Sequence, residues 1–277
     1  MSTAQTLILG AVAGFTIFLG LPFARMRGIS VGVKTLLASS ATGILIFLLW
    51  DVLSHAVGPV EEVMEDHEWG TFAGYVPLLA GGFIVGLMGL VYYDAWIRRR
   101  RQRALLGPGA ASEAEFTRAR SLAHLSPART LALFIATGIG LHNFGEGLAI
   151  GQSAAAGEVA LALTLIIGFG LHNATEGFGI VGPMAGEADR PSWKFLFLLG
   201  LIGGGPTFLG TIVGHQWVSE AASVGFFAIA AGSIIFVVQE LFHVTRRFNL
   251  PVLVTWTLLL GLALGFGTDF VLEAVGG

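Results

Sequence analysis

Residues 138–151 read GIGLHNFGEGLAIG, and residues 168–182 read GFGLHNATEGFGIVG, so one polar motif occurs twice within apolar surroundings. Both copies have the form H-N-x-x-E-G, and they lie thirty residues apart. In an α-helix the His and the Glu of each copy fall on one face, with the Asn about 100° round from the His. Ionisable groups are costly inside a bilayer, so two such clusters indicate a functional site.

The composition of the chain is that of a polytopic membrane protein. Apolar residues make up 54% of its 277 residues and charged residues only 12%, against roughly 25% charged residues in soluble domains. The 40 glycines are about twice the usual share and suit helices that pack closely in lipid. The chain has no cysteine, so any metal site must use nitrogen and oxygen ligands.

Eight apolar stretches are long enough to cross a bilayer, which requires about 20 residues per helix. We therefore predict an all-α integral membrane protein with eight transmembrane helices, forming a single transport domain over residues 1–277. The predicted helices cover about residues 4–24, 33–58, 71–97, 129–153, 157–183, 194–216, 222–244 and 250–272, and the one long connection is a loop at about 98–128.

The positive charges define an orientation. All 15 Lys and Arg residues fall in or beside the first, third, fifth and seventh connections. By the positive-inside rule these connections are cytoplasmic, so we expect both termini outside a plasma or inner membrane. The second connection is then also outside. Its acidic residues, within 61–68, either concentrate cations or form a solvated loop.

The short connection between the fourth and fifth helices makes them antiparallel neighbours, so the motif copies are related by a pseudo-two-fold axis in the membrane plane. Imidazole and carboxylate from both copies can then converge on one first-row divalent ion, and the two glutamates supply the charge that it cancels. Glycines in each copy are expected to bring these two helices together. Hydrogen bonding between helices is the competing explanation. The two asparagines are either ligands or partners of ligands.

The sequence HNFGEGLAIG followed by HNATEGFGIVGP resembles the fourth and fifth helices of the ZIP (Zrt/Irt-like) metal transporters, and the resemblance extends over the entire chain. It implies a ZIP-like bundle that carries zinc first, and also iron, manganese or cadmium, toward the cytoplasm. One departure is Gly205, which precedes Pro206 where many relatives with a binuclear centre have a glutamate, so chiefly one ion is expected. The metal-binding residues implied are His142, Asn143, Glu146, His172, Asn173 and Glu176.

Two further groups of polar residues are candidates for the ends of an ion pathway. Asp51 and His55 are four apart in the outer half of the second helix, where they form either an entrance or a hydrogen bond that fixes the helix. Toward the inner end of the seventh helix lie Gln239, Glu240 and His243, which form either an exit or a group in contact with water or lipid headgroups. Glu240 and His243 are spaced to share a face.

We expect a transporter and not an enzyme, with no catalytic residue and no cofactor, because the divalent ion is the cargo. The rival interpretations are an intramembrane zinc-dependent hydrolase, in which bound Zn²⁺ activates water, and a metal-sensing membrane protein. The expected partners are divalent metal ions and the lipid bilayer. A homodimer stays an open alternative, and no nucleic-acid partner is expected.

Overall fold

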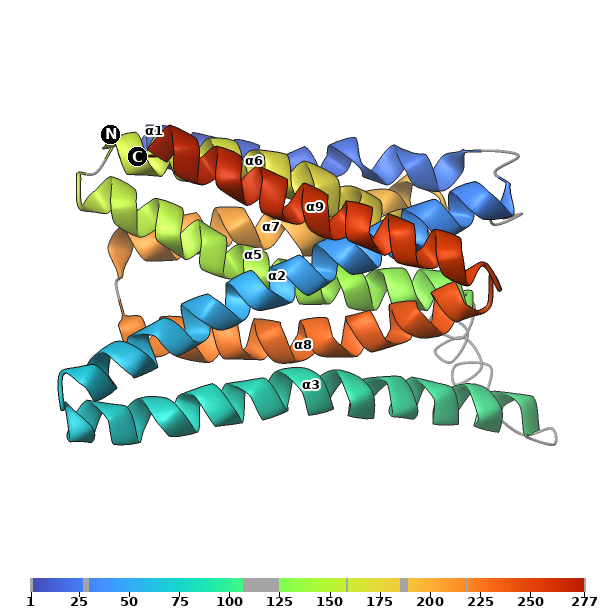
Figure 1. Cartoon of the computed structure of the whole chain (residues 1–277), viewed down its shortest axis with the longest axis horizontal. Coiled ribbons are helices and arrows are strands. Elements are labelled where there is room, and N and C mark those ends of the chain that lie inside the picture. The colour runs from blue at the N-terminus through green and yellow to red at the C-terminus, as the bar shows by residue number, and fades with distance from the viewer. Residues whose placement is uncertain are drawn as a thin grey trace.

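The computed structural model describes residues 2–26, 30–106, 125–157, 159–184, 189–217 and 219–276, and these residues form helices without any β-strand (Figure 1). The 3-10 helices η1 (Thr16–Leu19) and η2 (Leu21–Arg25) continue the first α-helix, and η3 (Gly182–Met184) continues α6. The α-helices are α1 (Thr3–Phe15), α2 (Val31–Glu65), α3 (Trp69–Leu106), α5 (Pro127–Ala155), α6 (Val159–Val181), α7 (Trp193–Gln216), α8 (Glu220–Arg246) and α9 (Pro251–Gly276).

Serine residues determine where five of these helices begin. Each serine side chain accepts a hydrogen bond from the backbone N–H three residues further on, which satisfies one of the amides that a helix start leaves unpaired. These N-cap residues are Ser2, Ser30, Ser126, Ser192 and Ser219. Each predicted apolar stretch overlaps one α-helix of the structure, and the second half of the first stretch is formed by η1 and η2.

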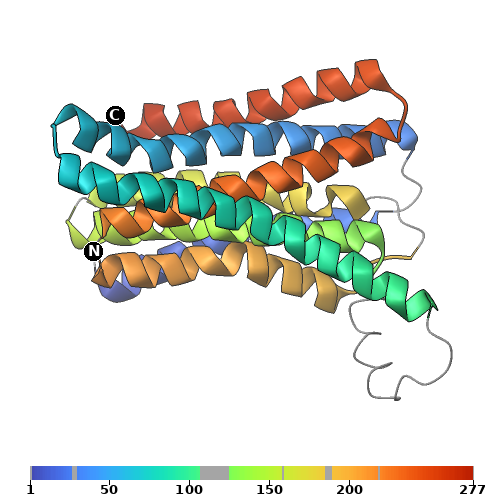
Figure 2. The same ribbon diagram turned by 90° about the horizontal axis from the view of Figure 1, so that it is seen from below.

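The helices run side by side along the long axis of the molecule (Figure 1, Figure 2). Successive helices alternate in direction, so both termini lie at one end of the bundle. The helix ends that carry the basic residues gather at the opposite end, the basic end of the bundle. This arrangement agrees with the alternation predicted from the charges, while the assignment of the basic end to the cytoplasm stays a prediction.

Within the described residues, six helical stretches are long and apolar enough to cross a membrane. These stretches are Thr3–Arg25, Val31–Glu65, Trp69–Trp96, Pro127–Ala155, Trp193–Gln216 and Glu220–Arg246. They make the chain compatible with a multi-pass membrane protein. Helices α6 and α9 correspond to the two other predicted spans, and their crossing of a membrane stays a prediction.

The helices pack as two groups. In one group α5 packs extensively on α7, and α1 with its 3-10 extension packs on α6 and α7. In the other group α3 and α2 both pack on α8, and α9 packs on α2. Contacts of α5 with α8 and of α6 with α2 and α9 join the two groups.

Glycines lie where the helices of the first group cross. A Cβ atom on Gly140 would stand 2.1 Å from the carbonyl oxygen of Ile202 in α7, and a Cβ on Gly210 would stand 2.1 Å from that of Phe144 in α5. A Cβ on Gly177 of α6 would meet the carbonyl oxygen of Ile17 in η1 at 2.2 Å. The motif glycines Gly140 and Gly177 therefore make contacts of α5 with α7 and of α6 with η1. The sequence had instead predicted that the motif glycines join α5 to α6.

Hydropathy located the apolar stretches but not every helix end. Helix α2 continues to Glu65, so most of the acidic segment predicted as a loop is helical, and His67 makes the turn in a left-handed conformation with φ of 61°. A helix can continue through charged residues beyond its apolar stretch, because charge alone does not end a helix. For the same reason α3 continues to Leu106, into the loop predicted at 98–128, of which residues 107–124 lie outside the described residues.

Candidate metal centre

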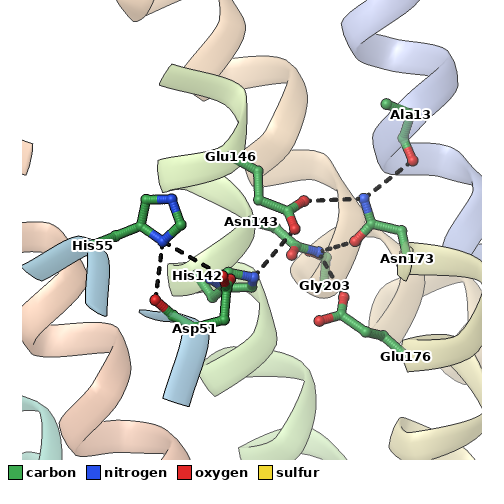
Figure 3. Close-up of polar contacts among 9 residues, drawn as sticks. All are labelled: Ala13, Asp51, His55, His142, Asn143, Glu146, Asn173, Glu176 and Gly203. Carbon is green, nitrogen blue, oxygen red and sulfur yellow. Dashed lines mark hydrogen bonds and ion pairs between the residues drawn. The ribbon is translucent and has the colours of Figure 1, made fainter. Parts of the chain in front are cut away.

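The two copies of the motif lie on neighbouring antiparallel helices. His142, Asn143 and Glu146 belong to α5, and Asn173 and Glu176 belong to α6. The Asn143 side-chain amide donates a hydrogen bond to Oδ1 of Asn173 at 2.6 Å, so the copies meet directly (Figure 3). His172 lies on α6 as predicted, but its side chain falls outside the described part of the structure.

All the described motif side chains are buried. His142, Asn143, Glu146, Asn173 and Glu176 each expose at most 3% of their surface. Two carboxylates in such a place require compensation by hydrogen bonds or by positive charge, because an isolated ion loses its hydration there. The structure supplies hydrogen bonds to both carboxylates from within the two motifs.

Each asparagine holds the carboxylate of the other copy. The Asn143 amide on α5 donates to Oε2 of Glu176 on α6 at 3.1 Å, and the Asn173 amide on α6 donates to Oε2 of Glu146 on α5 at 3.4 Å (Figure 3). Hydrogen bonds between helices stabilise membrane proteins by modest amounts individually, and these two also fix where the carboxylates point. The polar motifs therefore act on each other, as the pseudo-two-fold arrangement predicted.

Backbone carbonyls of α1 and α7 complete this network. The Asn143 amide also donates to the carbonyl of Gly203 on α7 at 3.0 Å, and the Asn173 amide donates to that of Ala13 on α1 at 3.2 Å. Ala13 lies next to the point where α1 gives way to the 3-10 helix η1. Four helices of one packing group thus enclose the site.

His142 faces the carboxylate of its own motif copy. Its Nε2 atom lies 3.1 Å from Oε1 of Glu146, the residue one helical turn further on (Figure 3). Glu146 thus has His142 at one carboxylate oxygen and Asn173 at the other. The i, i+4 spacing in the sequence predicted that this His and this Glu share a face, and the structure confirms it.

Asp51 and His55 of α2 lie beside this centre (Figure 3). The Nδ1 atom of His55 is 2.9 Å from the backbone carbonyl oxygen of Asp51 and 3.5 Å from its carboxylate. The His55 side chain is 58% exposed and that of Asp51 is 27% exposed, so this pair is partly open to the surface of the protein.

The residues predicted as an exit do not converge on the centre. Glu240 lies 3.6 Å from the guanidinium of Arg98 on α3, and the Nδ1 atom of His243 lies 2.8 Å from the carbonyl oxygen of Gln239. Arg98 also donates a hydrogen bond to Asp94 at 2.5 Å, which is the main reason that its pKa is raised above the ordinary value. Glu240 therefore joins α8 to α3, and an exit role for the three residues stays a prediction.

Nitrogen and oxygen atoms of both motif copies lie together in this centre. Among the described side chains, no three His, Asp or Glu residues are grouped so that they could hold a metal ion. Such groups of three exclude the asparagine amide oxygens, and they exclude the His172 imidazole because its side chain is not described. Oδ1 of Asn143 is buried without a hydrogen-bond partner in the described structure, and an amide oxygen can bind a cation. The available nitrogen and oxygen donors fit a first-row divalent ion.

The departure noted at Gly205 has a structural counterpart. A Cβ atom on Gly205 would meet no atom within 4 Å, whereas one on the preceding Gly204 would stand 2.1 Å from the carbonyl oxygen of Gly14 in α1. Close packing therefore requires glycine at 204 and not at 205. Gly205 leaves α7 without a carboxylate at a position that has room for a side chain.

Sequence reasoning missed the two backbone acceptors, Ala13 and Gly203. Neither is part of a motif, and a carbonyl group carries no sequence signal of its own. The two glycines that follow Gly203, in GGGP, indicated only close packing or a kink. Comparison with known proteins finds no matching family model and no curated protein with a significant match.

Proposed function

We propose that this chain is a multi-pass membrane transporter that carries divalent transition-metal ions, zinc first and also iron, manganese or cadmium, toward the cytoplasm. The observation that supports it is the buried pair Glu146 and Glu176, held by the amides of the opposite motif copies beside the His142 imidazole. Through the resemblance of these motifs, we assign the chain to the ZIP transporters as part of the same proposal.

A divalent ion suits this pair of carboxylates. Two ionised carboxylates in a low-dielectric site repel each other, and one ion of charge +2 cancels both charges. His142 supplies a borderline nitrogen donor, and Oδ1 of Asn143 supplies a neutral oxygen donor. We propose that the His172 imidazole of the second copy completes the set, and that the site binds chiefly one ion because Gly205 brings no third carboxylate.

The pathway proposed for the ion follows the orientation of the bundle. With the basic end in the cytoplasm, both termini are outside. The ion enters past Asp51 and His55, which lie beside the centre and are partly exposed, and it leaves toward the inner part of α8. The acidic turns at the end of α2 would attract cations to the entrance.

We propose alternating access as the transport mechanism. The ion site belongs to one packing group, because its ligands and the carbonyls behind them come from α1, α5, α6 and α7. The glycine contacts between α5 and α7 would make that group move as a unit against α2, α3, α8 and α9. A displacement of this kind would open a midplane site to one side of the membrane at a time.

Uptake into proteoliposomes tests the proposal. Purified protein is reconstituted with a zinc-sensitive dye inside the vesicles, and zinc is added outside with and without a gradient. Transport requires uptake above that of empty vesicles, and Glu146→Gln should remove it. The matched control is Glu220→Gln, which changes an exposed carboxylate at the start of α8 and should keep most of the uptake. Protein that binds zinc but never exceeds empty vesicles would contradict transport.

A further inference from the structure

An open groove lies at the basic end of the bundle, away from the ion site. It has a volume of about 460 Å³, and it runs between the 3-10 extension of α1 and the first turns of α7. Leu21 and Leu196 are almost fully buried and form its floor. The aromatic rings of Phe18 and Phe197, whose centroids are 5.7 Å apart, form a wall.

The rim of the groove is cationic. Trp193 and Lys194, the first two residues of α7, both line it. The guanidinium of Arg25 lies 4.9 Å from the centre of the Trp193 ring and donates a hydrogen bond to the carbonyl of Pro191. Arg25 is therefore held at the rim by the protein. The nearby Asp189 carboxylate is already paired with Arg129 at 2.8 Å, so it does not neutralise this rim.

These two properties match an amphiphile with an anionic head. The floor and the wall offer only hydrocarbon and aromatic surface, and the volume is within the roughly 300–1,000 Å³ of small-molecule sites. Lys194, Arg25 and the positive end of the α7 helix dipole favour an anionic group at the rim. Trp193 is 60% exposed at this point, as is typical of aromatic residues at the level of lipid headgroups.

The geometry points to a binding site for an anionic phospholipid of the leaflet at the basic end. One acyl chain lies in the groove over Leu21 and Leu196, and the phosphate of the headgroup lies between Lys194 and Arg25. This site rests on the membrane placement of the bundle and not on the metal proposal. The bound lipid contacts the short segment 16–25, whose other side packs against α6: a Cβ on Gly20 would stand 2.4 Å from the backbone nitrogen of Phe178.

Quenching of tryptophan fluorescence by brominated lipid tests this site. The full-length protein is placed in nanodiscs that contain, at equal mole fraction, phosphatidylglycerol or phosphatidylcholine with brominated acyl chains. Quenching is measured for the wild type and for Trp193→Phe, and the difference between them reports the brominated lipid next to Trp193. We expect brominated phosphatidylglycerol to quench Trp193 more effectively than brominated phosphatidylcholine. Lys194→Gln should lower that headgroup preference about fivefold, the effect of one basic side chain at a membrane surface.

The matched control is Lys34→Gln, because Lys34 is the only other lysine in the sequence and lies near the basic end on α2, outside the groove. It should leave the preference unchanged. Equal quenching by the two lipids would overturn the site, since it would show only the ordinary lipid surroundings of an exposed tryptophan. A loss in Lys34→Gln as large as in Lys194→Gln would also overturn it, because general attraction to the basic end would then explain the preference.

Discussion

Replacement of Asn143 by alanine tests the network that holds the candidate metal centre. The amide group of Asn143 has two protons for three acceptors, which are Asn173, Glu176 and the carbonyl of Gly203. One bond between helices in a membrane contributes about 0.6 kcal/mol. A bond to an ionised group such as the Glu176 carboxylate contributes about 1.5–3 kcal/mol. Asn143→Ala should therefore lower the free energy of unfolding by about 2–4 kcal/mol.

Asn143→Asp separates the two roles that the asparagine can have. Aspartate keeps an oxygen near the position of Oδ1 but cannot donate the amide hydrogen bonds, and its charge lies next to Glu176. Its unfolding free energy should therefore fall at least as far as that of Asn143→Ala. If Oδ1 binds the ion, Asn143→Asp should bind zinc more tightly than Asn143→Ala does.

Unfolding is measured by circular dichroism in mixed micelles with increasing SDS, and zinc binding by isothermal titration. Thr137→Ala is the control on the same helix, because the Thr137 hydroxyl donates only to the Leu133 carbonyl of its own helix, at 2.8 Å. Its unfolding free energy should stay within about 0.5 kcal/mol of the wild type. A similarly small change for Asn143→Ala would refute the reasoning, since the bonds between the motifs would then contribute little.

Three further changes should have measurable effects. Glu146→Ala and Glu176→Ala should each abolish high-affinity zinc binding in equilibrium dialysis; unchanged stoichiometry and affinity in both variants would remove the carboxylates from the site. Acidification from about pH 7 to about pH 5 should weaken zinc binding in isothermal titration, because protons compete for the imidazole and carboxylate ligands, whereas constant affinity would show that these groups are not ligands. Gly204→Ala should lower the free energy of unfolding in the SDS titration by about 1–3 kcal/mol, because the added Cβ would meet the carbonyl of Gly14. Gly205→Ala should raise it by roughly 0.5–1 kcal/mol, because its Cβ meets no atom and alanine is the better helix former. Equal effects would contradict the packing described.

The sequence was sufficient to place the helices and to pair the motifs. Apolar length depends only on composition along the chain, so each predicted stretch overlaps an α-helix, although the helix ends differ. The i, i+4 spacing put His142 and Glu146 on one face, because helical geometry is local. Alternation of direction followed from the charges and the short connections, and the bundle shows it (Figure 1).

What depends on packing could not be predicted in this way. The partner of Gly140 is Ile202 on α7, and nothing in either local sequence names the other. The Ala13 carbonyl is available to Asn173 through the crossing of α1 with α6. Helix ends beyond the apolar layer, such as that of α2 at Glu65, depend on backbone capping and not on hydropathy. The pairing of Glu240 with Arg98 likewise could not be predicted without knowing that α3 packs on α8.

The amide of Asn143 also constrains how the protein is made. Its acceptors Glu176 and Gly203 lie 33 and 60 residues further along the chain, so α5 is synthesised before the groups that satisfy it. Until α7 arrives, the polar side chains of α5 must be held by water or by the insertion machinery. Docking of α7 through Gly140 and Gly210 and closure of the network then occur together. Substitutions at these glycines should therefore reduce the amount of folded protein in the cell.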